Sequence, residues 1–182
     1  MITTLPILPT PRLRLRPMQE ADAAQVVAWR NAPHITRVSR TPRSTPFSKA
    51  EHLAWFRKTR EQRIDYMLEL NASHQAIGSF SVIIEPDADY GRCGILGRYI
   101  GETEQQGQGY ATEAARAWLA FVFETLDVPV VRAQMRSDNH ANIAINRKLG
   151  FRTLADKDIT GDIEWINMEL SRETWRKAQP PS

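Results

Sequence analysis

Apolar and polar residues follow regular spacings along most of this chain of 182 residues. Leu13 and Leu15 alternate with arginines, which predicts a first strand with one buried face that extends to Pro17. Between Thr112 and Leu126 the apolar positions recur every three or four residues, so we expect a helix packed on the core. The β-branched run from Val128 to Met135 predicts a buried strand.

Capping and turn residues place two further helices near the N-terminus. The segment Glu20–Asn31 has helical character, and Pro33 ends it. Ser48 with Glu51 three residues later is a capping box, which predicts a helix that ends near Arg63. The segment between these helices, residues 36–47, is rich in Pro, Ser and Thr and is expected to be a loop.

The remaining elements are mostly strands. They are expected over residues 66–70, 76–84, 93–100, 151–154 and 163–170. The turn 71–74 would join the first two strands as a hairpin, and residues 85–91 would form the next turn. Asp138 or Asn139 caps one more helix, and Gly150 ends it.

This order of elements predicts the fold class. The sequence β-α-α-β-β-β-α-β-α-β-β indicates an α/β (α+β) fold with a mixed central sheet of about seven strands and helices on both faces. The length allows one well-buried domain, so we expect a single domain over residues 1–182, with a frayed tail from 176 to 182.

Composition is that of a globular protein, with 42% hydrophobic and 25% charged residues and a net charge of +3. Positive charge gathers in three clusters: Arg12, Arg14 and Arg16; Arg37, Arg40 and Arg43; and Arg57, Lys58, Arg60 and Arg63. Such clusters suit an anionic ligand or nucleic acid. Solvated strand edges and helix faces explain these clusters better, and acidic residues are interspersed, so a nucleic-acid partner is not expected.

The cysteine and histidine residues argue against disulfides, a cysteine nucleophile and a metal site. The lone Cys93 forms no internal disulfide, which fits a reducing cytoplasm. It lies in an apolar strand without a neighbouring His and is expected to be an inert packing group. The four His residues show no ligand spacing, so no metal is expected. No long apolar segment predicts a signal peptide or a membrane span, and a cytoplasmic location is expected.

The segment from Gln106 to Ala111 contains two glycines directly before the predicted helix. Glycines let the backbone bend tightly, and the helix start presents N–H groups and positive dipole to an anion such as a diphosphate. A P-loop is excluded because no Lys follows Gly109. The dinucleotide fingerprint also fails, because Thr112 stands where its third glycine belongs.

The chain resembles the GNAT acyl-CoA N-acyltransferases over nearly its whole length. The family's pyrophosphate motif, Gln/Arg-x-x-Gly-x-Gly/Ala, is matched by Gln106, Gly109 and Ala111. Its second signature, an Asn that opens a helix closing in Leu-Gly-Phe, is matched by Asn139, Leu149, Gly150 and Phe151. Two motifs in the expected elements are more specific than either alone.

Two branches of the family share further features with the chain. The stretch Tyr110–Ala114 and the Leu-Arg-Leu-Arg-Pro start resemble the ribosomal-protein N-acetyltransferases. The patterns Trp29-Arg30-Asn31-x-Pro33-x-Ile35 and His52-x-x-Trp55-Phe56 are similar to enzymes that acetylate nucleotide-linked amino sugars. We rank nucleotide-linked amino sugars just above protein N-termini as acceptors. Their phosphates would also provide a ligand for the basic loop of Arg37, Arg40 and Arg43.

The resemblance implies a set of acetyl-CoA-binding residues. Backbone N–H groups would bind the diphosphate, at Gln106, Gly107, Gln108, Gly109, Tyr110, Ala111 and Thr112. The backbone of Tyr99, Ile100 and Gly101 would pair with the pantetheine arm, and one N–H near Tyr99 or Ile100 would polarise the thioester carbonyl. The expected ligands in the later helix are Asn139, Asn146 and either Arg147 or Lys148.

The usual proton-handling residues of the family are missing. The Tyr general acid is replaced by Asn146, a frequent Ser by Asn142 and a frequent strand Glu by Leu96. The catalytic residues are therefore unassigned, with Asn142 and Asn146 as weak candidates. Glu85, Asp87 or Glu102 would serve as base through a water chain, although each carboxylate is individually more often a solvated loop residue.

The resulting prediction is direct acetyl transfer from acetyl-CoA to a primary amine of a small molecule or peptide, without a covalent enzyme intermediate. A CoA-binding module with weak or lost catalysis is the alternative. The acceptor remains open, and so does the choice between a monomer and a homodimer.

Overall fold

The computed structural model describes residues 5–39 and 43–179, without the side chains of 156 and 157. Arg40 of the basic loop and residues 180–182 of the expected tail thus lie outside the described residues. The chain divides into two compact units, Met1–Ser81 with Arg98–Trp118, and Val82–Gly97 with Leu119–Ser182. Two strands run through both units.

The described strands form one mixed sheet in the order β1-β2-β3-β4-β5-β6-β8-β7. The strands are β1 (Leu8–Pro9), β2 (Leu13–Pro17), β3 (Arg63–Leu70), β4 (Ala76–Asp87), β5 (Gly91–Ile100), β6 (Val130–Arg136), β7 (Arg152–Thr160) and β8 (Ile163–Ser171). The β5–β6 pair is parallel, whereas β1–β2, β2–β3, β6–β8 and β7–β8 are antiparallel. The mixed α/β prediction is confirmed with one more strand than expected, because the short β1 lacks a periodic pattern of its own.

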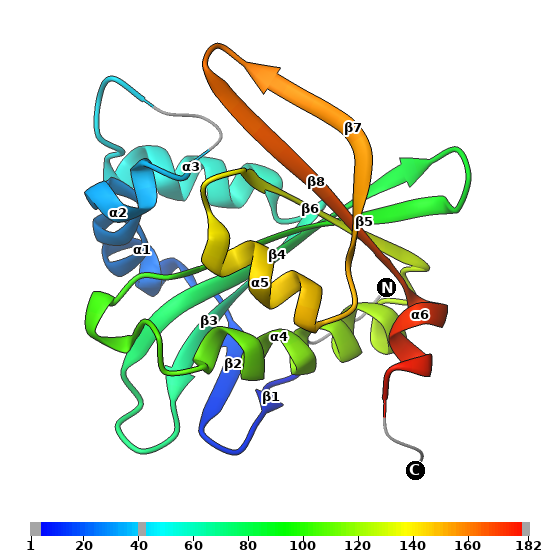
Figure 1. Cartoon of the computed structure of the whole chain (residues 1–182). Helices are drawn as coiled ribbons and strands as arrows, with labels where there is room; N and C mark the ends of the chain where they lie inside the picture. Colours follow the sequence, from blue (N-terminus) through cyan, green and yellow to red (C-terminus); the bar gives the residue numbers. More distant parts are fainter. Residues whose placement is uncertain (1–4, 40–42, 180–182) are drawn as a thin grey trace. The chain divides into compact units, whose positions relative to one another are not determined.

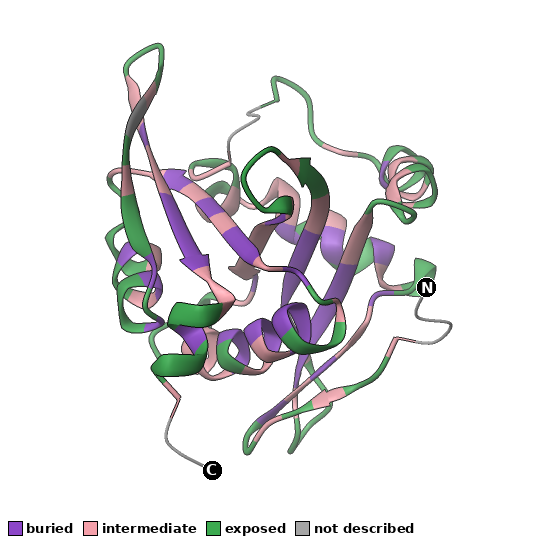
Figure 2. Cartoon of the chain, turned by 90° about the vertical axis from the view of Figure 1, so that its right-hand side faces the viewer, coloured by how far each residue is buried: buried purple, intermediate pink, exposed green. Residues whose placement is uncertain are grey.

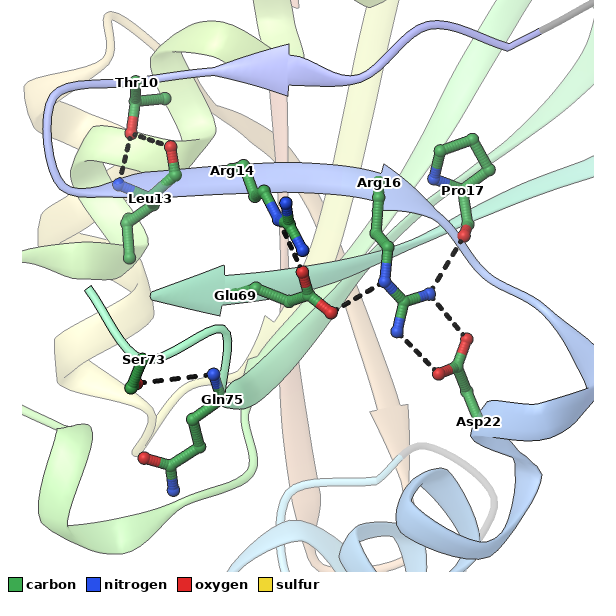
Figure 3. A network of polar contacts seen from close by, with 9 residues as sticks. All are labelled: Thr10, Leu13, Arg14, Arg16, Pro17, Asp22, Glu69, Ser73 and Gln75. Atoms are coloured by element: carbon green, nitrogen blue, oxygen red, sulfur yellow. Dashed lines mark hydrogen bonds and ion pairs between the residues drawn. The ribbon is translucent and has the colours of Figure 1, made fainter. Parts of the chain in front are cut away.

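In the first unit, β2 presents one apolar and one charged face. Leu13 and Leu15 are fully buried, as their alternation predicts. On the other face Arg14 and Arg16 each donate to the buried Glu69 of β3, at 2.6 and 2.7 Å, and Arg16 also binds Asp22 at 2.7 Å (Figure 3). The first basic cluster is therefore largely paired within the fold, which removes its support for nucleic-acid binding.

Five helical segments belong wholly to this unit. They are η1 (Glu20–Asp22), α1 (Ala23–Asn31), α2 (Pro33–Thr36), α3 (Lys49–Thr59) and η2 (Thr103–Gln105). Pro33 ends α1 as predicted but also opens α2, since proline suits the first helical position. The capping box of Ser48 and Glu51 is confirmed, and α3 packs against α1 (Figure 1). The helix ends before Arg63, which begins β3.

Two apolar clusters hold the first unit together. Trp118 of α4 (Tyr110–Ala120) meets Tyr66 and Phe80 edge to face, with ring centroids 5.0 and 6.2 Å apart. The second cluster consists of Met18, Val26, Trp29 and Met67, with Phe56, Ala76 and Tyr99 packed against it. Buried residues, in purple, lie along the strands (Figure 2). The second cluster fixes the positions of Trp29 and Tyr99, which lie near the end of β5.

In the second unit, β8 pairs with both β6 and β7, and β7 is much longer than the predicted strand 151–154. The helices are η3 (Phe121–Thr125), α5 (His140–Lys148) and α6 (Arg172–Lys177). The predicted helix 112–126 is thus an α-helix followed by a π-helical turn. Arg176 and Lys177 lie in α6, which the expectation of a frayed tail missed.

Several smaller expectations have clear outcomes. The turn predicted over residues 85–91 is shorter, because β4 continues to Asp87. Asn139, not Asp138, caps α5, and Gly150 follows that helix at a φ of 94°.

Cys93 is buried, and burial raises the pKa of its thiol to about 11. Within the described residues, none of the helices is long and apolar enough to cross a membrane.

Candidate active site

The glycine segment links η2 to the start of α4. Gly107 and Gly109 have φ values of 74° and 79°, a left-handed conformation that glycine adopts without the steric cost of a Cβ. Between them the chain turns sharply, and α4 begins at Tyr110 directly after Gly109. The sequence prediction of a tight turn at a helix start is confirmed.

The backbone N–H groups of this turn are available to a ligand. Among the described residues, none of the N–H groups from Gly107 to Thr112 donates to a protein acceptor, and the first bonded one is that of Glu113, which binds the Gly109 carbonyl at 3.1 Å. Consecutive unpaired N–H groups at a helix N-terminus attract anions. The turn therefore fits a diphosphate group.

Arg12 lies against the same turn, a contact that the sequence did not suggest. Its Nη1 donates to the Gln108 carbonyl at 3.1 Å, and its Cζ lies 4.6 Å from the centroid of the Tyr110 ring. A Cβ placed on Gly109 would lie 3.5 Å from Nη2. The guanidinium thus fixes the turn and adds positive charge beside the free N–H groups.

Glu113 holds Arg12 in that position. Its carboxylate accepts from the Arg12 Nε at 2.6 Å, from the Arg12 backbone N–H at 2.8 Å and from Thr10 Oγ1 at 2.7 Å. Burial raises the pKa of Glu113, but the hydrogen bonds from Thr10 and Arg12 outweigh burial and lower it below its usual range. The first turn of α4 is thereby joined to the β1–β2 connection by an ionised carboxylate.

The backbone at the end of β5 is hydrogen-bonded within the fold. The Gly101 N–H donates to the Ile77 carbonyl at 2.8 Å, and the His34 Nε2 lies 3.0 Å from the Gly101 carbonyl oxygen. A Cβ on Gly101 would come within 2.3 Å of the Trp29 ring, so glycine is needed there. Gly101, predicted to pair with pantetheine, instead uses both backbone groups within the fold.

Tyr99 and Ile100 precede this turn on β5. The register of the β5–β6 pair covers Gly94 with Val131 and Ile95 with Arg132, so residues 96–100 of β5 extend beyond that pairing. The Ile100 carbonyl accepts from Gln106 Nε2 at 3.1 Å. The first residue of the predicted pyrophosphate motif therefore ties the glycine segment to the strand that precedes it.

Glu102 follows β5 and is held by two side-chain donors. Its Oε1 accepts from Trp29 Nε1 at 2.7 Å and from Gln25 Nε2 at 3.0 Å. The carboxylate is therefore oriented, in contrast to a freely solvated loop residue. Sequence reasoning named Glu102 but missed Trp29 and His34, although the Trp29-Arg30-Asn31-x-Pro33 pattern had drawn attention to that segment.

The other two carboxylate candidates lie in the second unit, on β4. Glu85 is exposed. Asp87 accepts from the N–H groups of Tyr90 and Asp89 at 3.0 Å each and from Arg132 Nη1 at 2.6 Å. The Tyr90 N–H bond contributes most to lowering the pKa of Asp87. Burial opposes it, but the hydrogen bonds from Arg132 and Asp89 add to the Tyr90 bond, and the pKa is lowered. Asp87 thus stabilises a turn and is a poor base.

Helix α5 carries the remaining candidates. Asn139 Oδ1 accepts the Asn142 N–H at 3.4 Å as the helix cap, while Arg147 and Lys148 are exposed. Asn146 is fully buried, with Nδ2 at 3.7 Å from Met135 Sδ. A side chain without solvent-accessible surface does not meet a ligand in this conformation. We therefore leave Asn146 out of the site, both as a CoA ligand and as a proton carrier.

Within the first unit the structure brings together Tyr99, Ile100, Gly101, Glu102 and the glycine segment 106–112. Glu85, Asn139, Asn142 and Lys148 belong to the second unit. The first group combines a strand end, an oriented carboxylate and an anion-binding helix start. Such a group offers hydrogen-bond donors to an anion near an oriented carboxylate.

The chain belongs to the GNAT acetyltransferase family, because the family model for the acetyltransferase (GNAT) domain matches residues 12–152. This confirms the resemblance at the level of the family. The matched range includes segments of both units, so the family domain is made of both.

Solved structures share the fold at low sequence identity. Spermidine N-acetyltransferase from Vibrio cholerae, in complex with CoA and spermine, is 18% identical with a TM-score of 0.78, covering 91% of this chain and 98% of its own. RimL, a ribosomal L7/L12 α-N-protein acetyltransferase in complex with CoA, is 19% identical with a TM-score of 0.75, covering 91% and 98%. Apo FdhC, a nucleotide-linked sugar GNAT, is 14% identical with a TM-score of 0.77, covering 96% and 94%. The three differ in acceptor, so the shared fold does not identify the acceptor of this chain.

Proposed function

We propose that this protein transfers an acetyl group from acetyl-CoA directly to a primary amine. The observation that carries the proposal is the run of unpaired N–H groups from Gly107 to Thr112 at the start of α4. It matches the diphosphate of CoA in charge and in hydrogen-bonding type. Two of the similar structures, the spermidine and ribosomal-protein acetyltransferases, contain CoA.

The donor would be held from both ends of the β5–α4 connection. The N–H groups of residues 107–112 bind the diphosphate, with Arg12 supporting the turn through the Gln108 carbonyl, whereas the Gln106 N–H, expected to join them, donates to the Thr103 carbonyl at 3.1 Å. Tyr99 and Ile100 offer backbone to the pantetheine arm beyond the β5–β6 pairing, and one of their N–H groups polarises the thioester carbonyl. By the family resemblance, Asn139 and Arg147 or Lys148 of the second unit would be further CoA ligands.

Glu102 is the base that we favour, acting through water on the acceptor ammonium. Its Oε1 is anchored by Trp29, and Oε2 has no hydrogen bond to the described residues. The amine nitrogen then bonds to the thioester carbon, the C–S bond breaks, and CoA leaves as a thiolate that takes up a proton. Direct transfer needs no enzyme nucleophile, which agrees with the buried thiol of Cys93.

His34 of α2, which contacts the same strand end, is a second base candidate. Its Nε2 lies 3.0 Å from the Gly101 carbonyl oxygen, and a carbonyl oxygen only accepts, so Nε2 carries the proton. The lone pair on Nδ1 is then free, as a general base requires.

The donor site is tested by thermal denaturation with acetyl-CoA at millimolar concentration. Bound ligand raises the melting temperature by mass action. Gly109→Trp should abolish the rise by filling the turn, whereas Gly161→Trp should keep it. Gly161 is a matched control because it is exposed, has a φ of 61° and has open space around its Cβ position. An unchanged melting temperature of the wild-type protein with every acyl-CoA would refute the proposal.

The alternative is a CoA-binding protein with weak or lost catalysis. The burial of Asn146, at the position of the family's usual Tyr acid, favours it, because no ionisable group replaces that Tyr. The two functions are separated by measuring CoA release with a broad panel of amines. Tight acetyl-CoA binding without turnover would identify the binding protein.

A further inference from the structure

Arg30 has an unusual environment at the end of α1. Its Cζ lies 3.8 Å from the centroid of the Phe47 ring and 5.0 Å from that of Trp55, so the guanidinium rests against two aromatic rings. The residue is partly buried. Cation–π contacts stabilise such a guanidinium through its faces and leave the N–H groups at its edge unused.

The neighbouring cations already have anionic partners. Arg43 binds Glu51 at 2.9 Å, and Arg63 binds both carboxylate oxygens of Asp65 at 2.9 and 3.0 Å. Among the described residues, no carboxylate lies within ion-pair distance of Arg30. Three guanidinium groups therefore face two carboxylates, which leaves one net positive charge. Asp65 interacts electrostatically with Arg30 as well as with Arg63, but its ion pair is with Arg63.

The polar contact of Arg30 with the described residues is a long one, 3.5 Å from Nη1 to His52 Nδ1. His52 is buried; burial lowers its pKa most, followed by the charges of Arg30 and Arg63. An imidazole does not supply a negative charge, so His52 is no anionic partner for Arg30. A partly desolvated cation with free donors is costly unless an anion meets it, and the planar edge of a guanidinium suits a carboxylate or phosphate.

The segment that carries Arg30 also touches the end of β5. Trp29 donates to Glu102, and His34 contacts the Gly101 carbonyl. Arg30 is itself close enough to Tyr99 for the two groups to interact electrostatically. An anion held by Arg30 is therefore tied through α1 and α2 to the strand end where the thioester is proposed to lie.

We propose that Arg30 binds an anionic group of the acceptor, so that the substrate is a small-molecule amine that also carries a phosphate or carboxylate. This inference rests on the proposed function and defines its acceptor class. Phe47 and Trp55 hold the guanidinium face, and its edge binds the anionic oxygens. Acceptors without a negative group lose that interaction.

The test compares matched acceptors with the full-length protein. Glucosamine lacks an anionic group, glucosamine 1-phosphate and glucosamine 6-phosphate carry a phosphate, and glucosaminic acid carries a carboxylate. We expect kcat/KM to be about tenfold to a hundredfold higher for at least one anionic acceptor than for glucosamine, the range of a charged hydrogen-bonded pair. The phosphate and carboxylate arms show which anion is preferred. Equal kcat/KM values across the series would overturn the inference.

Variants assign the preference to Arg30. Arg30→Gln should remove it, and Arg30→Lys should restore part of it, because a lysine keeps the charge but not the bidentate geometry. Arg57→Gln is the control, because Arg57 is exposed and pairs with Glu20 outside this cluster. A preference that survives in Arg30→Gln would refute the assignment.

A binding measurement separates this inference from the donor proposal. Inorganic pyrophosphate should raise the melting temperature of Gly109→Trp, in which the donor turn is blocked, and should not raise that of Gly109→Trp/Arg30→Gln. An equal rise in both variants would overturn the role of Arg30. The rise in melting temperature that acetyl-CoA causes in the single variant Arg30→Gln reports only on the donor site.

Discussion

Trp29 donates its indole N–H to Glu102 Oε1 at 2.7 Å, and this bond ties a helix of the first unit to the residue that follows β5. The same indole ring lies against Gly101, where a side chain would clash. Trp29 thus packs against the end of β5 and orients the Glu102 carboxylate. The proposed chemistry depends on both effects.

Glu102→Gln is expected to lower kcat by a factor of about 10² to 10⁴, the usual contribution of a general base, with little change in the KM for acetyl-CoA. The amide keeps an oxygen for Trp29 but cannot take up a proton. Steady-state kinetics over a range of pH measures the effect. Glu104→Gln, two residues further along and exposed, is the control. If Glu102→Gln keeps the kcat of the wild type, Glu102 is not the general base and His34 is the remaining candidate.

Arg12→Gln is expected to weaken acetyl-CoA binding by about 1 kcal/mol, a factor of about five in Kd, because the Gln108 carbonyl loses a charged donor and the turn loosens. Isothermal titration calorimetry measures the change. Arg14→Gln is a matched control two residues further along the chain, since Arg14 lies on β2 and pairs with Glu69. It should alter stability and leave the Kd unchanged. Equal Kd values in all three proteins would show that Arg12 has no part in donor binding.

Asn146→Ala is expected to destabilise the fold by about 2 kcal/mol, because it opens a cavity at a fully buried position, and to leave the KM for acetyl-CoA unchanged. Chemical denaturation and steady-state kinetics give the two readouts. Asn142→Ala, on the same helix and partly exposed, is the comparison and should cost less stability. A several-fold rise in KM for Asn146→Ala alone would return this residue to the donor site.

Stability at acidic pH should depend on Asp22. Burial raises the pKa of its carboxyl, but hydrogen bonds from Arg16 and the Gln19 N–H outweigh burial and lower that pKa. The unfolded chain then binds the proton first as pH falls, so the stabilisation is present above about pH 4 and is lost below it. The difference in unfolding free energy between wild type and Asp22→Asn should shrink from pH 6 to pH 3. A difference independent of pH would contradict the assignment.

Local sequence was sufficient to predict the backbone of much of the proposed donor site. The glycines at 107 and 109 and the helix after them are short-range features, and a tight turn at a helix start follows from steric rules alone. The capping box of Ser48 and Glu51 and the buried face of Leu13 and Leu15 are equally local. The ends of β3, β4 and β7 were less predictable, because strand ends depend on the neighbouring strand.

Side-chain partners distant in sequence could not be predicted in the same way. Arg12 and Glu113 are about a hundred residues apart, and neither position has a periodicity that points to the other. The same holds for Trp29 with Glu102. Asn146 matched a motif position by spacing, yet packing in the second unit buries it.

The sequence by itself determined the family, the mixed α/β fold and the glycine turn before α4, because motifs and periodicity record backbone geometry over a few residues. The tertiary structure decided which charges are already paired. Arg14, Arg16, Arg43 and Arg63 look alike in the sequence as parts of basic clusters, and each has a carboxylate partner in the fold. Arg30 has none among the described residues, since burial and pairing depend on the elements that the fold brings beside it, and this difference defines the proposed acceptor site.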